Sequence, residues 1–154
     1  MMSTRIHGPL LGQASKCEPI LRSLPEWFGI EDAIIHYLQE IENLPTFITQ
    51  ENNQVIGFLT LKLHTDFAAE IYVMGIRPDA HRQGLGRRLV HKAEDNLRQQ
   101  GIEYLQVKTL SPEHPDSNYA NTRTFYEALG FRHLEEFKEL WGEENPCLQM
   151  IKKL

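Results

Sequence analysis

The chain has 154 residues with a formal net charge of −5, and 41% of them are hydrophobic; this predicts one soluble domain and argues against a nucleic-acid-binding protein. No apolar run approaches about 18 residues, so no transmembrane helix or membrane partner is expected. Two cysteines and scattered histidines exclude a disulfide framework and show no metal-ligand spacing, so no metal is expected. No secretory signal is visible at the start, and a reducing, cytoplasmic location is the expectation.

The first half of the chain predicts helices followed by a hairpin. Residues 1–15 are weakly patterned and predict a short strand or an extended arm. Helical spacing and β-rich runs predict helices over 18–24 and 31–43 and strands over 46–50 and 54–64. Pro25 is expected to stop the first helix. Asn52 and Asn53 lie between the two strands, and because Asn tolerates positive φ they predict a β-hairpin.

The second half predicts four strands and two further helices around the same sheet. The patterns indicate strands over 70–76, 105–109, 131–137 and 147–151, and helices over 84–99 and 118–129. Gly101 and Gly130 follow these helices, where a terminating glycine is common. The order of helices and strands is too irregular for a doubly wound sheet, so we expect a single α/β (α+β) domain over residues 1–154.

The most informative segment is the glycine-rich turn between the 70–76 strand and the 84–99 helix. Gly84 and Gly86 let the backbone approach a ligand closely, and the first amides of a helix have no internal partners. Together with the helix dipole, these amides form a site for an anion. The segment 77–92 contains five Lys or Arg residues and one acidic residue, which makes a local basic patch on an acidic protein.

Two common phosphate-binding motifs do not fit this turn. A P-loop requires Gly-Lys-Ser/Thr, whereas Gly86 is followed by Arg87 and Arg88. A dinucleotide fingerprint requires a small residue three positions after Gly86, and Leu89 occupies that position. The alternative to an anion site is a flexible turn before a solvated helix.

Two blocks of the chain resemble the GNAT superfamily of N-acetyltransferases. Residues 81–86, His-Arg-Gln-Gly-Leu-Gly, are similar to the family's acyl-CoA pyrophosphate loop. Residues 121–131, Asn-Thr-Arg-Thr-Phe-Tyr-Glu-Ala-Leu-Gly-Phe, are similar to its later helix, which ends in Tyr-x-x-x-Gly-Phe. The resemblance covers roughly residues 18–152. It implies a mixed central sheet of six to seven strands, two of them splayed to bind CoA, with about four helices.

The resemblance implies acetyl-CoA as the co-substrate. Its amide-bearing arm is expected to pair with the exposed strand edge from Met74 to Ile76, like an added strand. The residues that would bind the cofactor are Met74, Ile76, His81, Arg82, Gln83, Gly84, Leu85, Gly86, Arg87 and Asn121. The chain departs from the family pattern at two positions, because His81 stands where Gln or Arg is usual and Tyr119 where Asn is frequent.

The resemblance also implies the reaction, which is transfer of an acetyl group to a primary amine by direct attack. Glu70 lies 14 residues before Gly84, at the offset of the catalytic base in histone-type members; water is the alternative base. Tyr126 is placed near the CoA sulfur as the acid, since a phenol with a pKa near ~10 is protonated at pH 7. Without these roles, Glu70 would be a surface residue at a strand end and Tyr126 would pack beside Phe125.

Two loops are expected to hold the amine. Relatives build the acceptor pocket from loops that correspond to 25–29 and 141–146, and acidic, aromatic walls suit a cationic amine. The expected substrate-binding residues are Trp27, Phe28 and Trp141. The acceptor stays open among polyamines, aminoglycoside-like amines, amino acids and protein amines, and a homodimer stays open because many relatives are dimers. The alternative function is a non-catalytic acyl-CoA-binding or sensing module on the same fold.

Overall fold

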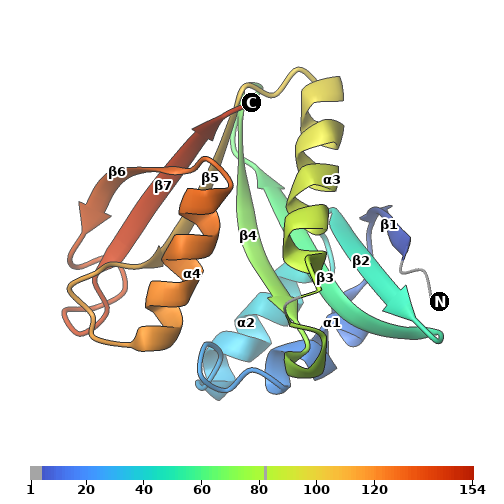
Figure 1. The fold of residues 1–154 in the computed structure, drawn as a ribbon, viewed down its shortest axis with the longest axis horizontal. Helices are drawn as coiled ribbons and strands as arrows, with labels where there is room; N and C mark the ends of the chain where they lie inside the picture. The colour runs from blue at the N-terminus through green and yellow to red at the C-terminus, as the bar shows by residue number, and fades with distance from the viewer. Residues whose placement is uncertain (1–4, 82) are drawn as a thin grey trace.

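The structure is a computed structural model that describes residues 5–81 and 83–154. One seven-stranded sheet, in the order β1-β2-β3-β4-β5-β7-β6, forms its centre (Figure 1). The strands are β1 (Arg5–Leu10), β2 (Thr46–Glu51), β3 (Gln54–Leu63), β4 (Ala68–Ile76), β5 (Tyr104–Leu110), β6 (Arg132–Phe137) and β7 (Cys147–Lys153). The helices are α1 (Ala14–Arg22), α2 (Glu31–Ile41), α3 (Leu85–Gln99) and α4 (Ser117–Ala128), with a 3₁₀ turn at Pro78–Ala80. The predicted mixed α/β fold is confirmed.

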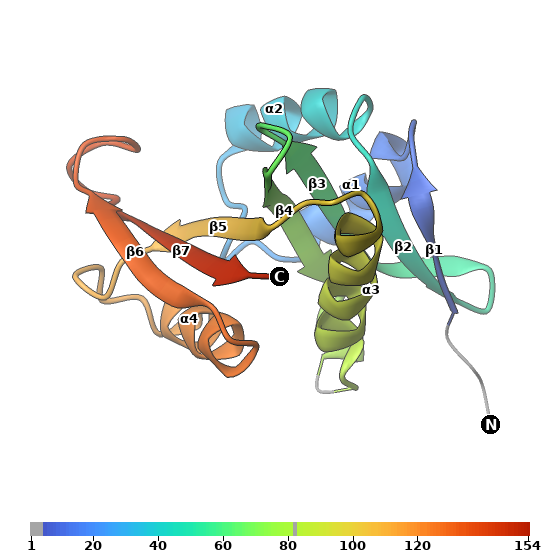
Figure 2. The same ribbon diagram turned by 90° about the horizontal axis from the view of Figure 1, so that it is seen from above.

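Helices cover both faces of the sheet. α1 and α2 lie on one face, and α3 and α4 lie on the other (Figure 2). The core on the α3 and α4 face packs residues of β4, β5 and α3 around Tyr126. The core on the other face packs Phe58 and Val73 of the sheet against Ile20 and Leu21 of α1. Within the described residues, no helix is long and apolar enough to cross a membrane.

Two elements begin two or more residues earlier than the sequence predicted. α1 begins at Ala14 instead of residue 18, and Pro19 lies inside it. Its buried residues are Cys17, Ile20 and Leu21. Because this buried face fixes the helix against the sheet, packing outweighs the local cost of the proline. β4 starts two residues before the predicted strand, since its first alanines pair with the first residues of β5.

The N-terminal segment and the asparagine turn have the conformations that their residues allow. Residues 5–10 form a strand that pairs antiparallel with β2, so of the two predicted forms the chain takes the strand. Asn52 and Asn53 have φ of 54° and 62° between β2 and β3. Positive φ at both central positions is the geometry of a two-residue hairpin turn, which confirms the predicted hairpin.

Candidate active site

The candidate site lies where β4 and β5 separate. These parallel strands form four residue pairs, the last of which joins Ile71 to Val107. In the ladder between β3 and β4, the register shifts between Ile71 and Val73, which leaves Tyr72 without a partner residue. An extra residue of this kind is a β-bulge, and it bends its strand. β4 therefore turns away from β5 directly after the last pair (Figure 1), and the predicted splay is confirmed.

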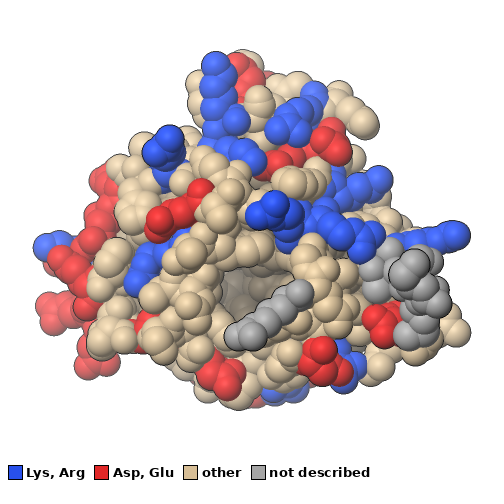
Figure 3. Space-filling model, in the orientation of Figure 1, with Lys and Arg blue, Asp and Glu red and all other residues tan. Residues whose placement is uncertain are grey.

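The gap between the two strands opens at the surface. Figure 3 has the orientation of Figure 1 and shows a hollow between α4 on one side and β4 with the start of α3 on the other. Lys and Arg side chains gather along its upper rim, whereas most Asp and Glu side chains lie further out (Figure 3). An anionic ligand that enters the hollow would therefore pass a positively charged rim.

α3 begins beside the wide end of the gap (Figure 1). Gly84 precedes the helix with φ of +74°, a conformation that glycine adopts without strain. A Cβ built on Gly84 would meet no atom within 4 Å, so the surface over the helix start is open. Among the described residues, no side chain caps the first turn. Its amides are therefore available to an anion.

Gly86 brings α3, α4 and β4 close together. A Cβ at Gly86 would lie 3.1 Å from Phe125 Cζ and 3.8 Å from Met74 Cε, so a larger residue would crowd the Phe125 ring. Met74 and Ile76 are half-buried on the same face of β4. Leu85 is buried in a separate small cluster, so its backbone rather than its side chain is offered to a ligand.

Among the other expected cofactor residues, some support the loop and some have side chains exposed to solvent. His81 Nε2 donates to the carbonyl oxygen of Ile76 over 2.7 Å, and its ring lies edge-on to Trp27 with centroids 6.4 Å apart. This nitrogen holds the loop in shape and is not directed to a phosphate. His81 is itself exposed, as are Gln83, Arg87 and Asn121. Arg82 lies outside the described residues.

Glu70 is held at the narrow end of the gap. Its side chain is 9% exposed, and Oε1 lies 2.6 Å from His64 Nε2. Its other oxygen, Oε2, lies 3.2 Å from Nζ of Lys108, which comes from β5. A buried carboxylate is tolerated when it is paired and hydrogen-bonded. Glu70 is thus a buried, doubly held carboxylate and not a surface residue at a strand end.

Tyr126 lies on α4 and is almost fully buried. Its ring makes edge-to-face contacts with Phe125 and Phe131, with centroids 5.2 and 5.4 Å away. Burial raises the pKa of the Tyr126 phenol well above its usual value, so the hydroxyl keeps its proton across the physiological range. The packing expected of a structural tyrosine and the protonation expected of an acid are both present.

The loop between α1 and α2 is tied to α4 across the gap. Trp27 Nε1 donates to Thr122 Oγ1 over 3.0 Å, and the Tyr119 hydroxyl donates to the Trp27 carbonyl oxygen over 3.1 Å. The tyrosine that replaces the family's frequent Asn therefore anchors this loop. Phe28 packs against Tyr37 with ring centroids 5.7 Å apart. The loop is a structured wall beside the site.

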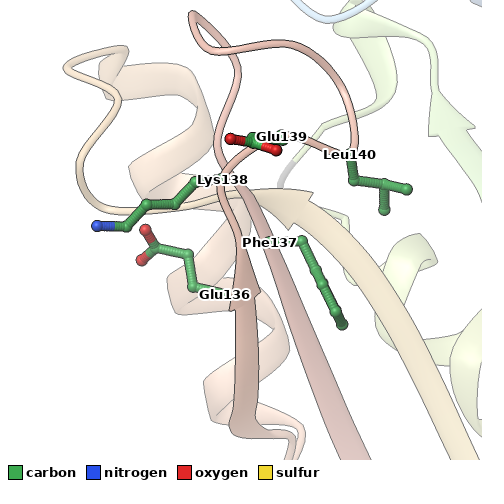
Figure 4. A pocket seen from close by; sticks show the side chains of 5 residues that line it. All are labelled: Glu136, Phe137, Lys138, Glu139 and Leu140. Atoms are coloured by element: carbon green, nitrogen blue, oxygen red, sulfur yellow. The ribbon is translucent and has the colours of Figure 1, made fainter.

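The second expected acceptor loop stands apart from the first. Trp141 is 41% exposed in the segment between β6 and β7. Among the described residues, no ring contact links Trp141 to Trp27 or Phe28. A surface pocket at the start of this segment is lined by Glu136, Phe137, Lys138, Glu139 and Leu140. In Figure 4 the side chains of Phe137 and Leu140 point to one side, whereas those of Glu136 and Lys138 point to the other.

Several residues beside Glu70 were not predicted from the sequence. His64 and Lys108 contact its carboxylate directly. The Tyr37 and Tyr72 rings extend the aromatic row from Phe28, with their own centroids 5.6 Å apart. In the sequence, Tyr37 follows the apolar spacing of a helix, which is typical of a core residue. Only the fold shows that its ring contacts Tyr72 at the bulge beside the site.

The mixed sheet opens between two parallel strands. The start of α3, which has no side-chain cap, lies at the wide end of this opening, and the buried carboxylate of Glu70 lies at the narrow end. This arrangement defines an α/β domain for an extended anionic ligand. The model of the acetyltransferase (GNAT) family matches residues 16–131. The chain therefore belongs to the GNAT family of acetyltransferases.

Known proteins resemble the chain in sequence and in fold. It is 31% identical over 134 residues to a mycothiol acetyltransferase of Renibacterium salmoninarum, covering 81% of this chain and 33% of that protein. The first curated relatives are all much longer, and the chain spans between 24% and 33% of their length. Two solved structures share the fold. A GNAT-family protein of Desulfovibrio desulfuricans has a TM-score of 0.82 at 18% identity, over 98% of this chain and 99% of that one. A GNAT acetyltransferase of Elizabethkingia anophelis with acetyl-CoA bound has a TM-score of 0.71 at 18% identity, over 98% of both chains.

Proposed function

We propose that the chain is an N-acetyltransferase that moves an acetyl group from acetyl-CoA to a primary amine. The observation that carries the proposal is the separation of β4 from β5, with the amides of α3 at the wide end and Glu70 at the narrow end. Family membership supports it, as do the printed names of the relatives and the acetyl-CoA bound to the Elizabethkingia protein.

The cofactor is proposed to bind in three parts. Its pyrophosphate takes the amides of the first turn of α3, from Leu85 to Arg87, because these amides have no side-chain cap and the helix dipole favours an anion. Its amide arm pairs with the free edge of β4 from Val73 to Ile76, as an added strand does. Its thioester then reaches the point where β4 and β5 meet, near Tyr126 and Phe125.

The chemistry requires removal of a proton from the amine and delivery of a proton to the thiolate. An alkyl ammonium with a pKa near ~10.4 must lose a proton at pH 7, which costs roughly 4–5 kcal/mol. Glu70, directly or through a water, is proposed to accept this proton. As the C–S bond breaks, the Tyr126 hydroxyl donates its proton to the leaving thiolate, for which its raised pKa keeps it protonated.

Ligand binding and turnover test the proposal together. A ligand at 100 times its Kd stabilises the folded state by ~2.7 kcal/mol, so saturating acetyl-CoA should raise the Tm by about 5–10 °C. Thiol release from acetyl-CoA is then measured with spermidine, kanamycin, lysine amide and a peptide with a free N-terminal alanine. At least one amine should accelerate release above the rate without amine.

A matched pair of glycine variants identifies the binding site. Gly84 and Gly101 precede and follow the same helix, both with positive φ and with no atom within 4 Å of a built Cβ. Gly84→Val should abolish the shift in Tm with acetyl-CoA, whereas Gly101→Val should keep it despite a similar cost in stability. A full shift in Gly84→Val would contradict the site. Binding without turnover on any amine would instead favour the non-catalytic acyl-CoA module.

A further inference from the structure

His64 joins the carboxylate of Glu70 to the surface of the protein. Its side chain is 34% exposed, while its Nε2 lies 2.6 Å from Glu70 Oε1. The other contact of this carboxylate, Lys108 Nζ, is less exposed. The imidazole therefore lies between a buried carboxylate and solvent.

The turn that carries His64 is well ordered by hydrogen bonds. The His64 amide donates to the Ala68 carbonyl oxygen over 3.0 Å. The Thr65 hydroxyl accepts from the amides of Phe67 and Ala68, over 3.1 and 3.0 Å. These bonds close the connection between β3 and β4 and fix the direction from which the imidazole meets Glu70.

Three further groups near Glu70 keep their protons at neutral pH, and they are Tyr37 from α2, Tyr72 from β4 and Cys147 from β7. Lys62 of β3 is the cross-strand partner of Glu70 and forms an ion pair with Glu40. Burial is the main cause that raises the pKa of Tyr72 to about 12 and that of Cys147 to about 11, and the negative charge of Glu70 contributes to both. The pKa of Tyr37 is raised for the same two reasons. None of the three is able to accept a proton from Glu70, which leaves the imidazole.

We propose that His64 is the proton exit of the site and acts as a positioning residue for Glu70. The proposal rests on the acetyltransferase function proposed above. The ammonium N–H bond breaks and its proton goes to Glu70. The Glu70 O–H bond then breaks as the proton moves to His64 Nε2, which receives it in the tautomer whose ring proton is on Nδ1. The imidazolium releases a proton from Nδ1 to water, so the net result is a free amine beside the thioester and one proton in solvent. Histidine suits this step because it is the side chain that changes charge between about pH 5 and 8.

The test is the pH profile of kcat/KM in His64→Gln, measured with the fastest amine of the panel. Glutamine keeps a hydrogen-bond donor toward Glu70 and removes the titration. We expect a loss of about 10²-fold near pH 7 and a flatter profile between about pH 5 and 8. His64→Ala should regain activity when imidazole is added. His64→Gln should add little to the defect of Glu70→Gln, because both act on one proton path.

His133→Gln is the matched control. Like His64, His133 contacts a glutamate, with its Nε2 3.3 Å from Glu127, but it does so at an exposed position on β6. It should keep the parental rate and profile. A His64→Gln variant with parental kcat/KM and profile would overturn the proposal. So would an equal loss at every pH without rescue of His64→Ala by imidazole, because that result assigns His64 to structure. Failure of the acetyltransferase function itself is recognised separately, by the absence of turnover in the parent protein.

Discussion

The carboxyl group of Glu70 has two partners and little contact with solvent, so its substitution gives a distinct kinetic result. Glu70→Gln keeps the size of the side chain and removes the proton acceptor. We expect the loss in kcat/KM to be largest at low pH, where free amine is scarcest, and to shrink as the pH approaches the pKa of the amine. An equal loss at every pH would assign Glu70 a positional role, and no loss would leave the proton to water.

Tyr126 offers a cleaner substitution, because its ring packs against Phe125 and Phe131 whereas its hydroxyl is the proposed acid. Tyr126→Phe keeps both edge-to-face contacts, with Phe125 and Phe131, and removes the proton donor. We expect kcat to fall by about 10²–10⁴-fold while the Tm shift with acetyl-CoA stays parental. Tyr104→Phe, on an exposed part of β5, is the control. A parental kcat in Tyr126→Phe would assign the residue to packing alone.

At the scale of residues, the sequence proposes candidate site residues but not the side chains that surround them. Glu70, Tyr126 and the glycines of the turn follow from local motifs. His64 and Lys108 depend on register: Glu70 pairs with Gln106 in the parallel ladder, so Lys108, two residues further on, faces the same side. The sequence alone does not show this register. It depends on β4 beginning at Ala68, which makes the connection from His64 a short turn.

At the scale of elements, two hydrogen bonds to α4 hold the loop from α1 to α2. One is donated by the Trp27 side chain, and the other is accepted by the Trp27 carbonyl oxygen. Trp27→Phe keeps the apolar surface and removes the bond from Nε1 to Thr122 Oγ1. A hydrogen bond of this kind contributes about 1 kcal/mol, which corresponds to about a five-fold rise in the acceptor KM if the loop holds the amine. Steady-state kinetics measure it.

Thr122→Val removes the same bond from the other side and serves as the partner in a double-mutant cycle. The effects of Trp27→Phe and Thr122→Val should be less than additive, since either change alone breaks the bond. Fully additive effects, or a change in the KM for acetyl-CoA instead of the amine, would contradict a role for this loop in acceptor binding.

The elements themselves follow from sequence periodicity except where packing or register decides. Pro19 argues against a helix from Ala14, and only the buried face that includes Ile20 explains why the helix forms there. The bulge at Tyr72 leaves no local signal in the sequence, because it is visible only in the register between β3 and β4. β4 is one apolar run in the sequence, but only its first half pairs with β5.

At the scale of the whole molecule, a buried ion pair joins helix α3 to strand β7. Lys152 Nζ of β7 lies 2.6 Å from Glu94 Oε2 of α3, and the glutamate side chain is 2% exposed. Lys152 also lies 6.0 Å from the ring centroid of Phe131, which packs on Tyr126. Helix α3, which is proposed to bind the cofactor, is thus linked to the half of the sheet beside α4.

Removal of one partner should therefore destabilise the fold. Lys152→Met leaves Glu94 buried without its partner, which costs about 3–5 kcal/mol and is measured by urea unfolding. Lys62→Met is the matched control, because the pair of Lys62 with Glu40 spans 3.6 Å between exposed side chains and contributes at most about 1 kcal/mol. Equal losses in the two variants would contradict a structural role for the buried pair.

The separation of β4 from β5 also bears on solubility. The unpaired backbone groups of a strand at a sheet edge can pair with another chain. An ordinary open sheet has two such edges, which are β1 and β6 in this protein. The divergence after Ile71 creates inner edges as well, along the last residues of β4 and β5. An extended amide-bearing ligand laid along β4 would cover one of them. Light scattering of concentrated, ligand-free protein should therefore rise on storage, and saturating CoA should suppress the rise. Adenosine 3′,5′-bisphosphate, which lacks the amide arm, should not; equal suppression by both would mean that the inner edge is harmless.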